Sequence, residues 1–247
     1  MTLLKTIAVA FGAIALAAAI APASLIDATL AARTQQRIRL TDTTGFWWRG
    51  SGVIASADGT QRLPIDWQLD GAALARGRIV VRLGRNGDAG PVAGTLSLRS
   101  DGLDVTSLRV RFPAAFAALF DARLNAVTLG GTVDAAAPSL SAAGDVVTGN
   151  LDATWERARV VTGDAVFDLG AVALKSVAAG DRWSASVQNT GGNVAVTGTI
   201  DGGAANSSGT LELQPDASAS AAVRNVLARF GVPDEKEGVR ITWQSPR

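Results

Sequence analysis

The chain has 247 residues, and its 23 basic and 22 acidic side chains leave a formal charge of only +1. It contains no histidine, cysteine or tyrosine, which excludes histidine-based triads, thiol catalysis, disulfides and histidine or thiolate metal sites. The balanced charge argues against nucleic-acid binding, which needs clustered positive charge to release counterions from the phosphates.

The remaining polar residues form no pattern typical of catalysis. No segment has the closely spaced oxygen ligands of a calcium loop or the Lys-Ser/Thr ending of a phosphate-binding loop. The charge run Asp234–Glu237 is typical of a solvated turn. We therefore expect no enzymatic activity, no cofactor and no metal ion.

The N-terminus carries an uncharged, mostly apolar run over residues 6–21, directly after Lys5. As a helix these 16 residues would span about 24 Å, and extension to Ile26 brings the segment to the roughly 30 Å of a hydrocarbon core, although Pro22 interrupts it. We interpret residues 1–26 as an inner-membrane anchor, with residues 3–26 in contact with the bilayer and the rest of the chain in the periplasm. The alternative is a cleaved signal peptide, because residues 21–23 have the small-x-small form of a cleavage site.

Residues 27–40 have apolar side chains near helical spacing, and arginines at positions 33, 37 and 39 lie in their C-terminal half. Cations at the C-terminal end of a helix interact favourably with its dipole. This pattern predicts a juxtamembrane helix that leads into the first strand.

From residue 41 to 247 the pattern is mainly that of β-strands. Ile79, Val81 and Leu83 alternate with Arg78 and Arg82, as expected for a strand with one apolar face. Similar segments recur, separated by turn residues such as Asp58-Gly59. Further strands are expected at 127–133, 151–161, 165–169, 183–187, 194–200, 210–213 and 239–243, with a bulge near 106–107.

A short phrase of glycine, a polar residue and an apolar residue also recurs, at residues 94–96, 131–133, 149–151, 198–200 and 209–211. We interpret these phrases as repeated strand entries with the glycine at the turn.

Two helices are expected to interrupt the strands, at 113–124 and 217–230. Pro113 is permitted in a first helical turn, and Asp216 can cap the second helix, whose apolar stripe would dock on a sheet. The sequence thus predicts a mainly β periplasmic domain at 41–247, a long antiparallel curved meander with a groove-like face and two short packed helices. We expect one continuous sheet wrapping over these helices; two packed sheets are the alternative.

The most unusual stretch is residues 44–54, where two tryptophans and an arginine lie among three glycines. In a strand, Trp47 and Trp48 would point to opposite faces, so that one is buried and the other is exposed or lies at a bilayer surface. A sugar-binding platform is the alternative. The other tryptophans lie in alternating patterns typical of core or half-core positions. The candidate structural or interaction residues are Gly45, Trp47, Trp48, Arg49, Gly50, Trp67 and Trp243.

Several of these features together resemble the type II secretion system protein N family. The features are the N-terminal anchor ending at residues 21–25, the stretch at 44–52, the segment Leu63–Leu69, the Gly-Thr-Leu phrases, and the tail at 227–233 followed by Gly238 and 241–243. They cover nearly the whole chain. The family's usual Gly-Thr-Leu-Trp form is here Gly45-Phe46-Trp47-Trp48.

This resemblance implies an inner-membrane-anchored periplasmic accessory component of the general secretion machinery, which contacts other secretion subunits and has no catalytic residues. The family is also similar to AsmA-like envelope domains, whose curved sheets are associated with lipid handling, so a phospholipid-binding groove is the first alternative. A cleaved, soluble periplasmic protein that binds a small ligand or polysaccharide is the second.

Overall fold

The computed structural model describes residues 27, 34, 36–84, 90–119, 124, 126–144, 146–203, 206–230 and 237–246. The predicted membrane anchor at 1–26 and most of the predicted juxtamembrane helix lie outside these residues. Within the described part of the chain, no helix has the length and apolar character needed to cross a membrane.

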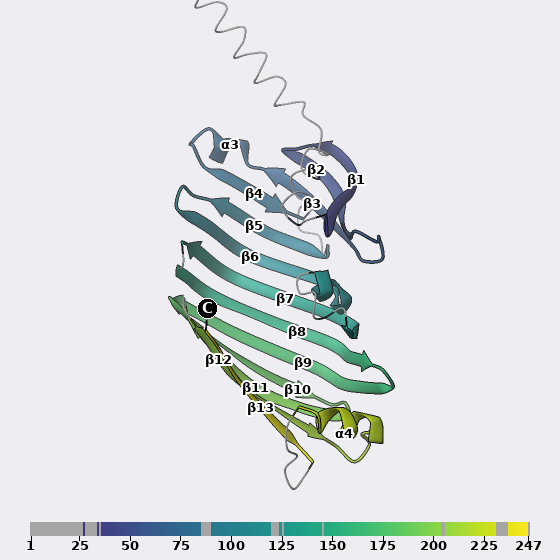
Figure 1. Cartoon of the computed structure of the whole chain (residues 1–247). Coiled ribbons are helices and arrows are strands. Elements are labelled where there is room, and N and C mark those ends of the chain that lie inside the picture. The colour runs from purple at the N-terminus through teal and green to yellow at the C-terminus, as the bar shows by residue number, and fades with distance from the viewer. Residues whose placement is uncertain are drawn as a thin grey trace, which may run out of the picture.

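The described residues form one antiparallel meander of 13 strands, in which each strand pairs only with its neighbours in sequence (Figure 1). The strands are β1 (Ile38–Phe46), β2 (Arg49–Ser56), β3 (Arg62–Leu69), β4 (Ile79–Leu83), β5 (Val92–Leu98), β6 (Gly102–Pro113), β7 (Thr128–Ala143), β8 (Val146–Thr162), β9 (Ala165–Gly180), β10 (Arg182–Thr190), β11 (Val194–Gly203), β12 (Asn206–Pro215) and β13 (Val239–Pro246). The sheet is open, with β1 and β13 at its two edges. The expectation of one continuous sheet is confirmed.

The described residues also form three short helices: α3 (Gly71–Leu74), the 3-10 helix η1 (Ala114–Leu119) and α4 (Ala221–Leu227). Helices η1 and α4 lie toward the same end of the strands (Figure 1). Both helices pack on the same face of the sheet. Val110 near η1 and Val196 near α4 point to the same side, as the pairing of residues from strand to strand between β6 and β11 shows. We call this the inner face and the opposite one the outer face.

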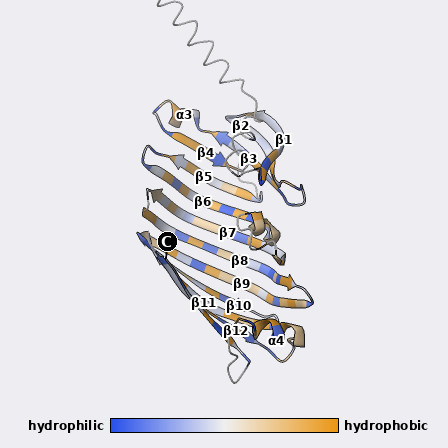
Figure 2. Cartoon of the chain, viewed as in Figure 1, coloured by the Kyte–Doolittle hydropathy of each residue, from blue (hydrophilic) through white to orange (hydrophobic). Residues whose placement is uncertain are grey.

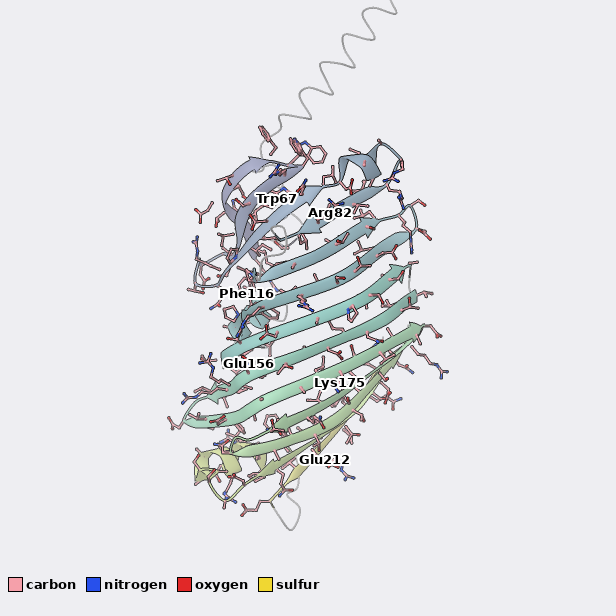
Figure 3. The ribbon with its side chains drawn as sticks, turned by 180° about the vertical axis from the view of Figure 1, so that it is seen from behind. Trp67, Arg82, Phe116, Glu156, Lys175 and Glu212 are labelled. Atoms are coloured by element: carbon pink, nitrogen blue, oxygen red, sulfur yellow. The ribbon has the colours of Figure 1, made fainter. Side chains whose placement is uncertain are left out.

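Apolar and polar residues alternate along the strands (Figure 2). Because successive side chains of a strand point to opposite faces, the two faces of the sheet differ in polarity. On β8, for example, Leu151 and Ala153 face inward and are partly buried, whereas Asp152 and Thr154 face outward and are exposed. Seen from behind, the outer face carries Arg82, Glu156, Lys175 and Glu212 (Figure 3). The sheet is therefore a single amphipathic layer.

The buried core is divided between the two helices. Under α4, Val223 and Leu227 pack against residues of β9, β11 and β13. Under η1, Phe116 packs against Leu63 and Val92. A third cluster, around Leu40 and Trp67, lies at the β1–β3 end of the sheet.

The sheet curves around α4. The cluster under this helix includes Ala165 on β9 and Val239 on β13, which lie four strand spacings apart. In a flat sheet that separation would be about 19 Å, whereas a seven-residue helix is only about 10 Å long and about 10–12 Å wide. Inward bending of the strands is therefore required, as the predicted curved meander implies.

Several predicted boundaries are wrong. Ile38–Leu40, expected at the end of a helix, begin β1, because Ile38 and Leu40 are buried in alternation with exposed Arg39. Pro113 ends β6, and the following helix is a 3-10 turn over Ala114–Leu119. The last helix begins later than predicted, since Ser220 caps it and Asp216 instead accepts hydrogen bonds from Ser218.

The glycine phrases are strand interiors, not turns. Gly149 on β8 has a φ of 128°, and a Cβ there would collide with the carbonyl oxygen of Ser139 on β7. The β7–β8 register shifts at this level, so the glycine permits a bulge. The bulge predicted near residues 106–107 is confirmed, because Ser107 has a φ of 52° and the β5–β6 register shifts opposite it.

Candidate functional site

The glycine–tryptophan stretch forms the hairpin between β1 and β2. Trp47 and Trp48 lie in the turn, so the prediction that they alternate across a strand is wrong. The ring of Trp48 stacks on Phe46, with centroids 5.7 Å apart and planes within 1°. The turn can close tightly because Gly45 has a φ of 85° and a Cβ there would lie 2.6 Å from the Arg49 carbonyl oxygen.

Trp67 on β3 anchors this hairpin from the inner face. Its Nε1–H donates to the carbonyl oxygens of Trp47 at 3.0 Å and Phe46 at 3.3 Å. Its ring lies over Gly50, its register partner on β2, and a Cβ on Gly50 would lie 2.7 Å from Trp67 Cζ2. Only 8% of Trp67 is exposed, so glycine at position 50 creates the space that buries the indole.

The same arrangement recurs near the other edge of the sheet. Trp183 on β10 covers Gly202 on β11, and Trp243 on β13 covers Gly209 on β12, in each case directly across the strand pair. These two residues are 38% and 37% exposed, which agrees with the half-core part of the prediction and not with full burial. They lie flat on the inner face beyond the reach of the α4 core.

Most of the predicted interaction residues come together in space. Gly45, Trp48, Arg49, Gly50 and Trp67 line one hollow of about 420 Å³ at the β1–β3 end, with Trp47 in the adjoining turn. Trp243 lies apart from them, on the opposite edge strand. The hairpin residues thus form one local unit, whereas the role of each in an interaction stays a prediction.

Sequence reasoning missed a second feature, an apolar strip on the inner face away from η1 and α4. Its register partners run without interruption in two rows, one across β4 to β8 and a shorter one across β5 to β7. We call this the open strip; its residues are Ile79, Leu98, Leu103, Ala142 and Val147 in one row and Leu96, Val105 and Leu140 in the next. Ile79 and Leu98 are exposed and five others are half-buried, whereas Val105 is buried, although none of the eight belongs to the three core clusters of the described residues.

The open strip is a surface for contact, not an enclosed cavity. Leu98 is 47% exposed, and five strands at about 4.8 Å spacing make the strip about 19 Å long. Its exposed members are Ile79 and Leu98, flanked by half-buried residues, and exposed apolar surface of this kind typically marks an interaction site. In the sequence, the alternation of apolar and polar residues along these strands indicates that one face of the sheet is apolar. Only the positions of η1 and α4 reveal which part of that face the helices leave uncovered.

The outer face is held by exposed ion pairs between side chains. Arg99 pairs with Asp104 at 2.8 Å, and Arg111 reaches both Asp134 at 3.6 Å and Glu156 at 3.4 Å. Exposed pairs of this kind contribute about 0–1 kcal/mol each. Their main consequence is a polar outer surface.

The start of β1 is fixed by Asp27, one residue after the predicted anchor. Its carboxylate accepts hydrogen bonds from Arg39 at 2.7 Å and from the backbone N–H of Leu40 at 2.7 Å. These hydrogen bonds, first that of Arg39, hold the pKa of Asp27 below its usual value. Across the described parts of the chain, no group of three or more acidic residues is close enough to hold a metal ion.

A family model supplies the decisive comparison. The type II secretion system (T2SS) protein N model matches residues 36–242, which include the whole sheet except the last four residues of β13. The chain belongs to this family. No curated protein and no solved structure matches the chain.

Membership of the T2SS protein N family implies a role in type II secretion and contacts with other subunits of the secretion system. Components of this system are cell-envelope proteins, and protein N is a structural component that is generally non-enzymatic. The predicted family resemblance is therefore confirmed.

Proposed function

We propose that this protein N is a periplasmic accessory component, held at the inner membrane by residues 1–26, which acts by binding other secretion subunits on its inner face. The observation that carries the proposal is the open strip. A family of structural components needs contact surfaces, and this strip combines apolar character, exposure and a length of about 19 Å on a pre-formed sheet. A rigid sheet loses little conformational entropy when a partner binds.

The test compares charge insertion on the two faces. Leu98→Glu introduces a carboxylate into the open strip, whereas Val177→Glu introduces the same group at an outer-face position that is 52% exposed. Both positions are exposed, so neither variant should unfold the sheet, which circular dichroism would verify. We expect Leu98→Glu to reduce co-purification of secretion subunits with the full-length protein at least tenfold, and Val177→Glu to leave it unchanged. Equal co-purification with both variants would contradict the proposal.

A second candidate function is lipid handling, favoured by the same uncovered apolar rows. An acyl chain could lie along the open strip, as the similarity to AsmA-like domains suggests. Mass spectrometry of the full-length protein, purified in mild detergent, distinguishes the two functions. Stoichiometric phospholipid that is lost in Leu98→Glu, without secretion subunits, would favour lipid handling.

The same mass measurement tests the anchor. An intact N-terminus supports residues 1–26 as a retained membrane segment. A soluble product that begins at Ser24 would favour the third possibility, a cleaved periplasmic protein that binds a small ligand or polysaccharide.

A further inference from the structure

The two edge strands of the open sheet differ in how far other groups protect the backbone on their free side. On β1, the N–H of Leu40 donates to the Asp27 carboxylate and the N–H of Ile38 donates to Thr34 Oγ1. The strand is also interrupted by a register shift between Thr41 and Thr44, where Asp42 has a φ of 51°. Such side-chain contacts and bulges are the usual protections of an edge against pairing with another chain.

The β13 edge has none of these protections among the described residues. All eight residues from Val239 to Pro246 pair with β12 in one unbroken register. β13 is the last strand of the sheet, and among the described residues no further strand pairs with its other side. The one charged side chain of the strand, Arg240, is already paired with Glu212 on β12 at 2.5 Å. Alternate N–H and C=O groups of β13 therefore form a straight template for another strand.

We propose that β13 pairs antiparallel with β13 of a second copy of this chain, so that two sheets join edge to edge around a two-fold axis at Thr242. This register uses nearly the full strand and keeps inner residues opposite inner residues. It places Thr242 opposite its own copy, Ile241 opposite Trp243, and Arg240 opposite Gln244. A register shifted by four residues, with the axis on Arg240, would oppose two like charges, which is unfavourable.

The side-chain pairs of this register are favourable ones. Thr–Thr and aromatic–β-branched pairs across antiparallel strands each contribute about 0.2–1 kcal/mol. The ring of Trp243, 37% exposed in one copy, gains an apolar neighbour from the second copy on the inner face. Because β13 is antiparallel to its copy, the two α4 helices lie at opposite ends of the shared strand pair and leave the joint free.

Because only the β13 edge takes part in the pairing, assembly ends at a dimer. The protected β1 edge cannot accept β13, so the contact is of the self-complementary kind and does not continue into a filament. The dimer is independent of what binds the open strip, and it would make the two strips parts of one longer inner face.

Disulfide trapping tests the register directly, because the chain has no cysteine of its own. Thr242→Cys places two thiols opposite each other across the axis, within the roughly 4.4–6.8 Å Cα separation of a disulfide. Thr210→Cys is the matched control. It substitutes the register partner of Thr242 on β12, one strand further in, and its copy would be about 14 Å away. In membranes that contain the full-length chain, we expect oxidation to give a covalent dimer of Thr242→Cys and at least tenfold less of Thr210→Cys.

A charge-reversal pair provides a second readout. Thr242→Lys and Thr242→Glu each oppose two like charges at the axis, so each should run in detergent as a monomer of 25.2 kDa, whereas an equal mixture should restore the doubled mass. Thr242 is exposed, so both variants should keep the fold. Failure of Thr242→Cys to cross-link more than Thr210→Cys would overturn the proposal, as would a wild-type protein that is monomeric at every concentration.

Discussion

Replacement of Gly50 by alanine should destabilise the β1–β3 end of the sheet, because the new Cβ conflicts with both the Trp67 ring and a backbone carbonyl. The new Cβ would lie 2.7 Å from Trp67 Cζ2 and 2.5 Å from the carbonyl oxygen of Thr44, well below ordinary contact distances. Gly50 does not have a positive φ, so backbone strain plays no part. The indole must therefore move away from the position in which it is 92% buried and donates to the Trp47 carbonyl.

The magnitude follows from what the ring loses. Exposure of about 100 Å² of indole surface costs about 2.5 kcal/mol, at about 25 cal/mol per Å². Weakening of the Nε1–H hydrogen bonds adds about 1 kcal/mol. Alanine offsets about 0.5 kcal/mol of this cost, because it lowers the conformational entropy of the unfolded chain. The net loss in the free energy of unfolding is therefore about 3 kcal/mol.

Urea unfolding of the full-length protein in mild detergent, followed by tryptophan fluorescence, measures this loss. Gly71→Ala is the matched control, because a Cβ there has nothing within 4 Å and the φ is not positive; its free energy of unfolding should change by less than about 1 kcal/mol. The cause is tested by a double-mutant cycle with Trp67→Leu. If the ring conflict is responsible, Gly50→Ala should cost at least about 1 kcal/mol less in the Trp67→Leu background. Additive losses would refute the reasoning.

Three further perturbations have defined outcomes. Gly202→Ala brings its Cβ against Trp183 in the same way, but that ring is 38% exposed and can swing into solvent, so thermal unfolding should show a loss of only about 1 kcal/mol. Asn189→Ala should cost about 2–3 kcal/mol in the same assay, because its side chain donates to the carbonyl oxygens of Leu169 and Val194 and accepts from Val196 N–H, which closes the β10–β11 turn; a loss below about 0.5 kcal/mol would contradict this role. Asp27→Asn should lower the melting temperature at pH 7. The folded pKa of Asp27 lies below its unfolded value of about 3.9, so the wild-type advantage is complete above about pH 5 and disappears as the pH falls through the folded pKa. A pH-independent difference between the two proteins would be evidence against the Arg39 and Leu40 contacts as its source.

Much of the fold follows from local patterns in the sequence. Alternation at Ile79–Leu83 and the parity change between Val105 and Leu108 correctly predicted a strand and a bulge, because each depends only on neighbouring residues. The order of strands was also accessible, since a meander pairs each strand with the next.

The errors arose where tertiary contacts decide the outcome. Ile38 and Leu40 have helical as well as alternating spacing, and only burial against β2 and β3 selects the strand. Glycines such as Gly149 look like turn residues until a bulge in the neighbouring strand explains them. Trp47 and Trp48 were grouped correctly with Gly50, but the tight turn depends on the conformation of Gly45.

The open strip could not be found from sequence alone. Its leucines and valines have the same pattern as the core residues under η1 and α4. What distinguishes them is the length of two short helices and the end of the strands on which these helices dock.

The meander has a consequence for how the chain acquires its structure. Since each strand hydrogen-bonds only to strands adjacent in sequence, no pairing waits for a distant segment, and the contact order of the sheet is low. Hairpins can form one after another, beginning at the N-terminal end of the sheet. For the same reason, the sheet can gain or lose a pair of neighbouring strands during evolution without disturbing the inward and outward positions of the rest, so that the length of the inner face is free to vary.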